Sequence, residues 1–256
     1  MNLGFQEDQA AFESASQTAR VTTEGWAARE LYCPACGDDA LAAYPNNKPV
    51  ADLFCKSCNE DYELKSQKTR IGAKVLDGAW ATMLQRLTSA SNPSLFVMRY
   101  HAEVRAVRDL IVVPKHFFTP DLIEKRKPLA PTAWRAGWVG CNILVGRVPP
   151  LGRIDIVREG QIVDRAEVVN RWRRTSFLRE KRPDTRGWLI ETMAQIEMLG
   201  RKEFTIDDAY GFAPALSALY PENSHVREKI RQQLQFLRDH GWLEFVGRGR
   251  YRLIKR

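Results

Sequence analysis

The sequence has no long hydrophobic run. No stretch of about 18 apolar residues, the length that crosses a membrane, occurs in its 256 residues. The amino terminus carries Glu7, Asp8 and Glu13, whereas an export signal needs a basic start followed by an apolar stretch. We therefore expect a soluble, cytoplasmic protein with no membrane partner.

Several common catalytic motifs are also missing. The chain contains no GxxxxGK[ST] phosphate-binding loop, no GxSxG nucleophile motif and no HExxH zinc motif. Its four histidines, His101, His116, His225 and His240, have neither metal-ligand spacing nor an HNH arrangement. These absences argue against the enzyme classes that depend on those motifs.

Positive charge is abundant and unevenly distributed. Lys and Arg number 39 against 31 Asp and Glu, which gives a net charge of +8. Residues 225–256 hold nine basic and three acidic residues, or +6 of that total. This distribution favours a polyanionic partner, although a merely solvated basic surface is the simpler alternative.

A second basic run, Arg171–Arg182, precedes the turn-rich stretch Pro183–Gly187. Turn-forming residues with little to bury are typical of a connection between domains. The sequence therefore predicts a first domain of residues 1–182 and a second of residues 183–256.

Four of the five cysteines form two CxxC pairs, Cys33 with Cys36 and Cys55 with Cys58, separated by 18 residues. Two such turns can complete a closed tetrahedron around one ion and leave no position for a substrate. We therefore predict a structural zinc site. Two disulfides are the alternative, but they require an oxidising compartment. The remaining Cys141 is predicted to be a small buried residue.

An acidic and basic pattern surrounds the second cysteine pair. Asp52 is followed after ten residues by Glu63-Leu-Lys65. Alternation places Glu63 and Lys65 on one face of a strand and directs Leu64 into the core. Two carboxylates can hold Mg²⁺, and a lysine can orient or deprotonate water and stabilise negative charge. The pattern alone is weak, because charged residues alternate on many solvated strands.

The segment after this pattern, Lys74–Leu87, has apolar residues at helical spacing and is predicted to form a core-packing helix. The basic side chains around it either line a groove for phosphates or form ordinary solvated surface; they are Lys68, Arg70, Lys74 and Arg86.

The C-terminal part has the pattern of a winged helix. We predict helices over 188–199, 209–219 and 226–240, a Thr205–Asp208 capping box, and a cap at Asn223 or Ser224. A basic hairpin over 242–254 forms the wing. Polar side chains suited to DNA lie on the third helix and the wing, namely Arg231, Gln232, Gln235, Arg248 and Arg250. A winged helix used only for protein contacts is the alternative.

Together these residues resemble the DpnI family of methyl-directed restriction endonucleases along almost the whole chain. The supporting stretches are Tyr32–Gly37, Asn47–Asp52, Glu63–Ser66, Asp77–Ala79, Lys127–Thr132, Arg135–Ile143, Ser176–Arg179 and Arg231–Gln235. Two tryptophans, Trp80 and Trp134, depart from the smaller or more polar residues that the resemblance leads us to expect.

The resemblance implies an α/β fold: a PD-(D/E)xK nuclease domain with an inserted zinc knuckle, followed by a winged helix. It implies a cytoplasmic bacterial enzyme that cuts double-stranded DNA at GATC when the adenines are methylated. Asp52, Glu63 and Lys65 map onto the family's catalytic residues, and the four cysteines onto its zinc ligands. We expect Mg²⁺ to be held by Asp52, Glu63 and the Leu64 carbonyl, in a monomer.

We place methyl recognition in residues 127–142, with Trp138 as the apolar surface and Arg135 beside it. Trp138 as an ordinary core residue is the alternative. Two other functions stay open at this point: a methyl-DNA reader that does not cut, and a transcription regulator built from a zinc ribbon and a winged helix.

Overall fold

A computed structural model describes most of the chain, namely residues 1–6, 14–45, 51–88 and 92–254. The chain divides into two compact units, which we describe separately. The first contains residues 1–147 and 151–176, and the second contains residues 148–150 and 177–256. Residues 47–50 of the stretch Asn47–Asp52, which supported the family resemblance, fall outside the described residues.

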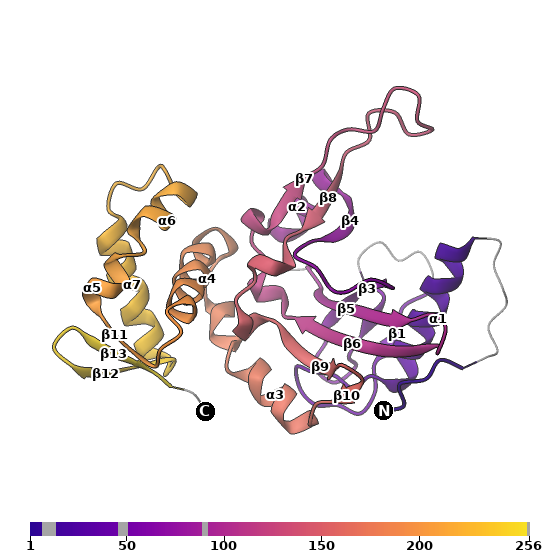
Figure 1. Cartoon of the computed structure of the whole chain (residues 1–256), viewed down its shortest axis with the longest axis horizontal. Coiled ribbons are helices and arrows are strands. Elements are labelled where there is room, and N and C mark those ends of the chain that lie inside the picture. Colours follow the sequence, from indigo (N-terminus) through magenta and orange to yellow (C-terminus); the bar gives the residue numbers. More distant parts are fainter. Residues whose placement is uncertain (7–13, 46–50, 89–91, 255–256) are drawn as a thin grey trace. The chain divides into compact units, whose positions relative to one another are not determined.

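The first unit is built around a seven-stranded sheet with the order β1-β2-β3-β5-β6-β9-β10 (Figure 1). The strands are β1 (Ala42–Ala43), β2 (Leu53–Phe54), β3 (Asp61–Gln67), β5 (Ser94–His101), β6 (Ala106–Val113), β9 (Ile154–Arg158) and β10 (Gln161–Ile162). Strands β3 and β5 pair in parallel, and the other neighbours are antiparallel. The central strands are mostly buried, which explains their apolar, β-branched sequences.

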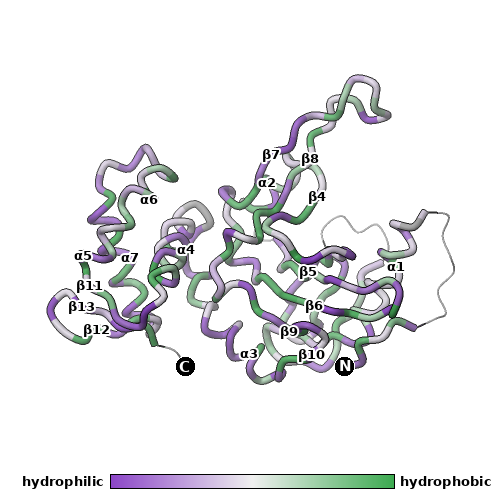
Figure 2. Tube along the Cα trace, in the orientation of Figure 1, coloured by the Kyte–Doolittle hydropathy of each residue, from purple (hydrophilic) through white to green (hydrophobic). Residues whose placement is uncertain are grey.

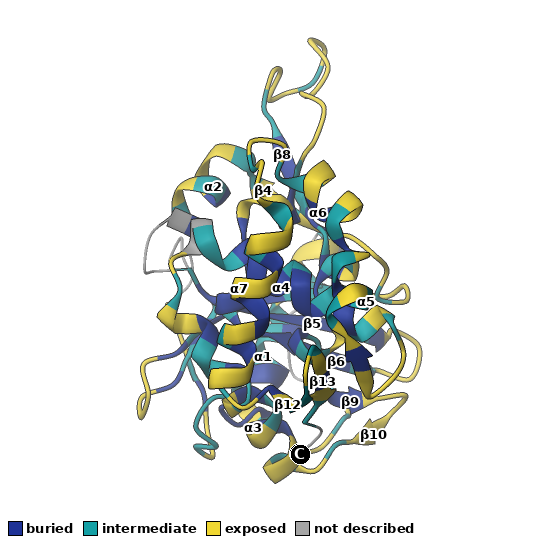
Figure 3. Ribbon diagram, turned by 90° about the vertical axis from the view of Figure 1, so that its left-hand side faces the viewer, coloured by how far each residue is buried: buried dark blue, intermediate teal, exposed yellow. Residues whose placement is uncertain are grey.

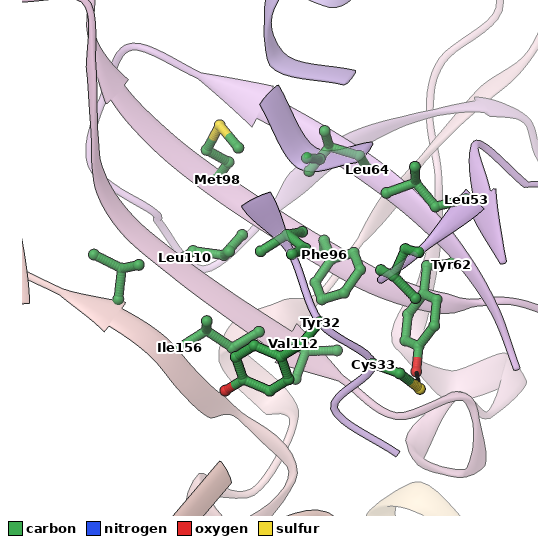
Figure 4. Close-up of a cluster of buried hydrophobic side chains, with 14 of the residues drawn as sticks. Tyr32, Cys33, Leu53, Tyr62, Leu64, Phe96, Met98, Leu110, Val112 and Ile156 are labelled. Carbon is green, nitrogen blue, oxygen red and sulfur yellow. Dashed lines mark hydrogen bonds between the residues drawn. The ribbon is translucent and has the colours of Figure 1, made fainter. Parts of the chain in front are cut away.

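Two helices pack onto this sheet, α1 (Ala15–Glu30) and α3 (Arg165–Arg173). Each contributes a fully buried tryptophan, Trp26 from α1 and Trp172 from α3. Strand side chains complete the same core: Tyr62 stacks on Phe96 with ring centroids 4.7 Å apart (Figure 4). The core therefore fixes β3 beside β5 in the sheet and packs it against helix α1.

A second, three-stranded sheet of the first unit has the order β4-β8-β7. Its strands are β4 (Val75–Ala79), β7 (Ile123–Lys125) and β8 (Gly140–Ile143), and the helix α2 (Trp80–Thr88) follows β4 directly. Residues 126–139 connect β7 to β8 as a protruding arm (Figure 1).

The helix predicted over Lys74–Leu87 was therefore wrong in its first half. Val75–Ala79 pairs with β8 in an antiparallel ladder, with Asp77 opposite Cys141. Leu76, which we assigned to a buried helix face, is 65% exposed. Tertiary pairing with a strand more than 60 residues away outweighs the local helical spacing, and no local pattern reports such pairing.

The second unit has the winged-helix arrangement. Its helices are α4 (Pro183–Met198), α5 (Ile206–Tyr210), α6 (Ala213–Leu219) and α7 (Val226–Asp239), and its strands are β11 (Glu203–Thr205), β12 (Leu243–Gly247) and β13 (Arg250–Leu253). The strand order is β11-β13-β12. Hydropathy alternates along α7 (Figure 2), and so do buried and exposed segments (Figure 3). Its buried residues include Ile230, Leu234 and Leu237.

Four local predictions for this unit need correction. The first helix begins at Pro183 and not at Trp188, so the stretch Pro183–Gly187, predicted as a turn-rich connection, is helical; proline fits a first helical turn, where its missing N–H has no partner to lose. The capping box at Thr205 and Asp208 is present, but its helix begins at Ile206, because Thr205 is the N-cap. That helix is interrupted at Gly211, so the predicted 209–219 helix is divided in two. The N-cap of α7 is His225; the Asn223 side chain accepts from the His225 main-chain N–H instead. Strand β11 was missed, because three residues carry too little pattern.

Short 3₁₀ helices complete the described chain, at Lys115–Phe117, Pro120–Leu122, Val145–Arg147, Pro150–Gly152 and Ser176–Glu180. Among the residues that the structure describes, no helix is long and apolar enough to cross a membrane.

Candidate active site and zinc centre

A cleft of about 710 Å³ lies along strand β3 in the first unit. Asp52, Glu63 and Lys65, the three residues predicted from the sequence, all line it. Helix α1 contributes Arg20 and Glu24 to the same cleft. One cavity therefore gathers two carboxylates and an ammonium group, the set that the sequence pattern called for.

Alternation along β3 produces this arrangement. Tyr62 is 0% and Leu64 is 8% exposed, so these two side chains face the core, while Glu63 and Lys65 face the cleft. Asp52 is attached to the same strand: its main-chain N–H donates to the Tyr62 carbonyl at 2.9 Å. Its Oδ2 accepts from the Leu64 main-chain N–H at 2.8 Å. The backbone of β3 thus orients the Asp52 carboxylate.

The ammonium group of Lys65 is held by two carboxylates. Its Nζ lies 2.7 Å from Glu63 Oε1 and 2.7 Å from Asp77 Oδ1. Burial lowers the pKa of Lys65, but the negative charges of Glu63 and Asp77 outweigh it and raise that pKa above its ordinary value. Lys65 is therefore a stable cation at neutral pH.

Sequence reasoning did not assign Asp77 to the site. Its side chain is only 5% exposed, and it reaches Lys65 from β4. We had interpreted this segment as a helix, where Asp77 would be one polar residue on the outer face. The available signal was the stretch Asp77–Ala79, which supported the family resemblance without pointing to a role.

Asp52 has a different electrostatic environment. Burial raises the pKa of Asp52, and the nearby Glu24 charge adds to this effect. The Leu64 N–H, Arg20 and Lys65 act in the opposite direction without cancelling it. Arg20 reaches Asp52 only at 3.5 Å, because its Nε is paired with Glu24 at 2.5 Å. A cation bound beside Asp52 would favour its ionised form.

The four basic residues predicted near the cleft differ in their positions. Arg70 and Lys74 line it, and Lys74 also pairs with Glu124 at 2.6 Å. Arg86 extends from α2 to Glu63, with 3.5 Å between Nη2 and Oε2. Lys68 is exposed and is not among the lining residues. Of the four basic residues considered, two are therefore placed to meet a phosphate backbone.

The four cysteines of the CxxC pairs come together, with all four Sγ atoms within 4.8 Å of one another. Cys33 and Cys58 are 3.6 Å apart, and so are Cys36 and Cys55. A tetrahedral zinc ion with Zn–S bonds of about 2.3 Å separates its sulfur ligands by about 3.8 Å. A disulfide needs about 2.05 Å, so the thiolates fit zinc rather than two bridges.

The zinc centre is built into the connection between β2 and β3. Cys55 and Cys58 form the turn that joins these strands, and the Cys55 N–H donates to the Glu60 carbonyl at 2.9 Å. The Tyr62 hydroxyl lies 3.1 Å from Cys33 Sγ (Figure 4). Metal at this turn would therefore stabilise the register of the two strands that carry Asp52 and Glu63. Cys141 is fully buried elsewhere.

The predicted methyl-sensing residues lie on the arm. Trp138 is half-buried, and its ring occupies the space above Gly140, where a Cβ would lie 2.8 Å from it. The guanidinium of Arg135 lies 5.0 Å from the centre of the Trp138 ring. Trp138 thus presents part of an apolar ring to solvent beside a cation.

The predicted DNA-reading residues of the second unit are exposed but not all adjacent. Gln232 and Gln235 line a hollow of about 380 Å³ on α7. Arg231 instead donates to the Tyr210 hydroxyl, and Arg227 stacks on the same ring. Arg248 and Arg250 lie in the turn and second strand of the wing, and both are exposed.

Zinc removal provides a test of the metal centre. We expect one zinc per purified chain, and Cys55→Ser to lower the thermal midpoint strongly, because a structural zinc contributes on the order of 10 kcal/mol. Elemental analysis and thermal unfolding measure both effects. Cys141→Ser is the matched control and should keep its zinc. Purified protein without zinc, or a Cys55→Ser variant with unchanged zinc content and midpoint, would contradict the assignment.

Two family models match the chain. The Dam-replacing family (DpnI) matches residues 1–181, and the Dam-replacing HTH domain (DpnI_C) matches residues 184–253. The first match covers more than half of the sequence, and the two together confirm the predicted resemblance and the predicted fold class. The chain therefore belongs to the Dam-replacing family (DpnI).

Proposed function

We propose that this protein is a type II restriction endonuclease that cuts double-stranded DNA at GATC sites whose adenines carry a methyl group on the exocyclic nitrogen. Family membership supports a nuclease, and the HTH match supports DNA binding. The observation that carries the proposal is the single cleft lined by Asp52, Glu63 and Lys65. We assign catalysis to residues 1–182 and additional DNA reading to residues 183–256, in a cytoplasmic, monomeric enzyme.

The donor atoms of the cleft suit Mg²⁺. Asp52, Glu63 and the Leu64 carbonyl would hold the ion, since Mg²⁺ is commonly bound through one or two carboxylates together with water and substrate phosphates. When bound, the ion polarises the phosphate and lowers the pKa of water. Asp52 Oδ2 already accepts from the Leu64 N–H, which leaves Oδ1 on the cleft side.

Lys65 acts as a fixed cation in this proposal. In the metal-free cleft the charges of Glu63 and Asp77 raise the pKa of Lys65, so its ammonium keeps its proton there. An ammonium has three donors, and the Glu63 and Asp77 contacts use two of them. The third can orient the attacking water or stabilise the charge that develops on the phosphate. Asp77 is then a positioning residue for Lys65.

Methyl recognition is assigned to two places. On the arm, the half-exposed ring of Trp138 offers an apolar surface, and Arg135 adds a cation for the DNA. In the second unit, Arg231, Gln232 and Gln235 contact base edges and the wing arginines contact phosphates. A site of four base pairs gives one DNA-binding unit little contact area. Two units that recognise the same methylated site therefore increase the discrimination between methylated and unmethylated DNA.

Glu63→Ala should abolish magnesium-dependent cutting of methylated plasmid, because it removes both a metal ligand and a partner of Lys65. Binding of methylated duplex without metal should persist or tighten, since a negative charge beside the DNA is lost. Gel assays of cutting and titrations of binding measure the two effects. Glu103→Ala, on an exposed turn, is the matched control and should cut normally.

Magnesium-dependent cutting of methylated plasmid, with unmethylated plasmid digested in parallel, separates the proposed nuclease from both alternatives. A methyl-DNA reader and a transcription regulator would cut neither plasmid. Near-normal turnover by Glu63→Ala would exclude the assignment of this residue.

Trp138→Ala should reduce the preference for methylated over unmethylated plasmid. Burial of one methyl group is worth only about 1 kcal/mol, so we expect a loss of about fivefold for each adenine that Trp138 contacts. The ratio of the two cleavage rates measures this preference. Trp138→Phe, which keeps an apolar ring, should retain most of it. An unchanged ratio in Trp138→Ala places the sensor elsewhere.

The second unit has its own buried core, so residues 177–256 can be tested as a fragment. The fragment should bind methylated GATC duplex more tightly than unmethylated duplex, and Gln235→Ala should reduce this difference. Affinity should fall steeply with salt, and Arg248→Ala should reduce the salt slope by about one. Equal affinity for both duplexes in a titration would reduce the unit to a non-specific anchor.

A further inference from the structure

The arm formed by residues 126–139 is an ordered hairpin. Hydrogen bonds join its limbs: the Leu129 N–H donates to the Trp138 carbonyl at 2.9 Å, and the Arg126 N–H to the Gly140 carbonyl at 3.0 Å. At the tip, the Ala133 N–H donates to the Ala130 carbonyl at 2.9 Å. The arm therefore holds its tip in a defined position relative to β7 and β8.

The tip carries Trp134, whose side chain is 100% exposed. Each of the other six tryptophans of the chain is buried or half-buried. A large aromatic side chain left fully in water gains nothing from folding, and no packing within the described protein accounts for it. Its placement on a short ordered turn instead favours a contact with another molecule.

The charge of the arm indicates what that molecule is. Residues 126–139 include three basic residues, Arg126, Lys127 and Arg135, and no acidic one. Most of the arm is exposed (Figure 3). Arg126 and Lys127 are both exposed, and no ion pair joins either to an acidic side chain of the described chain. The limb that leaves β7 is the hydrophilic one (Figure 2). Unpaired cations beside an exposed aromatic ring suit a nucleic acid, which offers phosphates and base faces together.

The arm is joined to the catalytic cleft through one small sheet. Strand β8, at the base of the arm, pairs with β4 so that Cys141 lies opposite Asp77, and Asp77 holds Lys65. DNA in the cleft therefore passes the base of the arm. Residues 126–130 precede the turns of the tip, and five extended residues span about 16 Å, whereas four base pairs cover about 14 Å. The tip can reach beyond the target site.

We propose that Trp134 contacts duplex DNA outside the four-base-pair target, where its indole ring packs against base and sugar faces in a groove. This inference rests on the proposed nuclease function and extends it to flanking sequence. Apolar side chains that enter a groove in this way partly unstack base steps, so the contact also favours flanks that deform easily.

The test compares two methylated duplexes with one GATC each, one trimmed to about two base pairs on either side and one with about ten. The full-length chain is titrated with each duplex in EDTA. Trp134→Ala should weaken binding to the long duplex about tenfold, the size of one lost stacking contact, and leave the short duplex unaffected. Trp134→Phe should retain most of the affinity.

Two controls make the result specific. Val104→Ala changes another exposed apolar side chain, 70% exposed on a turn away from the arm, and should bind both duplexes normally. The salt dependence of binding should be unchanged in Trp134→Ala, because no charge is removed.

Wild-type affinity of Trp134→Ala for the long duplex overturns the inference. So does a DNA-independent dimer that sedimentation detects in wild-type protein and that Trp134→Ala loses, because the ring then contacts a second copy of the chain. Failure of the proposed function is a separate result: the wild-type enzyme would then leave methylated plasmid uncut. If wild-type and Trp134→Ala proteins both cut methylated plasmid and bind the long duplex equally, only the Trp134 contact is rejected.

Discussion

The candidate active site depends on the antiparallel pairing of β2 with β3. This pairing places Asp52 beside the strand that carries Glu63 and Lys65, and the Leu64 N–H orients the Asp52 carboxylate. The turn between the two strands contains Cys55 and Cys58, so the same short segment supplies half of the four-cysteine cluster that could bind zinc. Strand β2 meets β3 at only two residue pairs, Leu53 with Tyr62 and Phe54 with Asp61, which is too few to fix the register of β2 alone. A metal ion held by the four cysteines at this turn would supply the missing constraint.

Ion pairs of Glu63 and Lys65 connect this strand pair to other elements of the first unit. Glu63 is buried enough to need partners, and it receives Lys65 from its own strand and Arg86 from α2. Lys65 in turn binds Asp77 on β4, which joins the central sheet to the small one. Removing one member of such a network leaves an uncompensated charge in a partly desolvated place. An ion pair therefore connects the cleft to the small sheet, and strand pairing connects that sheet to the arm.

Several parts of the fold could be predicted because their signals are local. The bounds predicted for α7 differ from the observed ones by one residue at the carboxyl end, because its apolar residues repeat at helical spacing. The capping box of Thr205 and Asp208 was found from two side chains, but the helix it begins was placed three residues late. Strand β4 was mistaken for helix, because the adjacent apolar residues Val75 and Leu76 fit a helical stripe, whereas a strand directs them to opposite faces. Only the partner strand β8 decides between these alternatives, and it is distant in sequence.

By itself, the sequence determined the ligand chemistry and the side-chain alternation. Two CxxC pairs specify four thiolates, and Glu63-Leu-Lys65 specifies which side chains share a strand face, because the backbone geometry of turns and strands is local. Only the tertiary structure decided that Asp77 belongs to the site, that Arg231 is engaged with Tyr210, and that Trp134 is fully exposed. These three facts depend on which distant segments meet, and long-range packing leaves no periodic trace in the residues that it brings together.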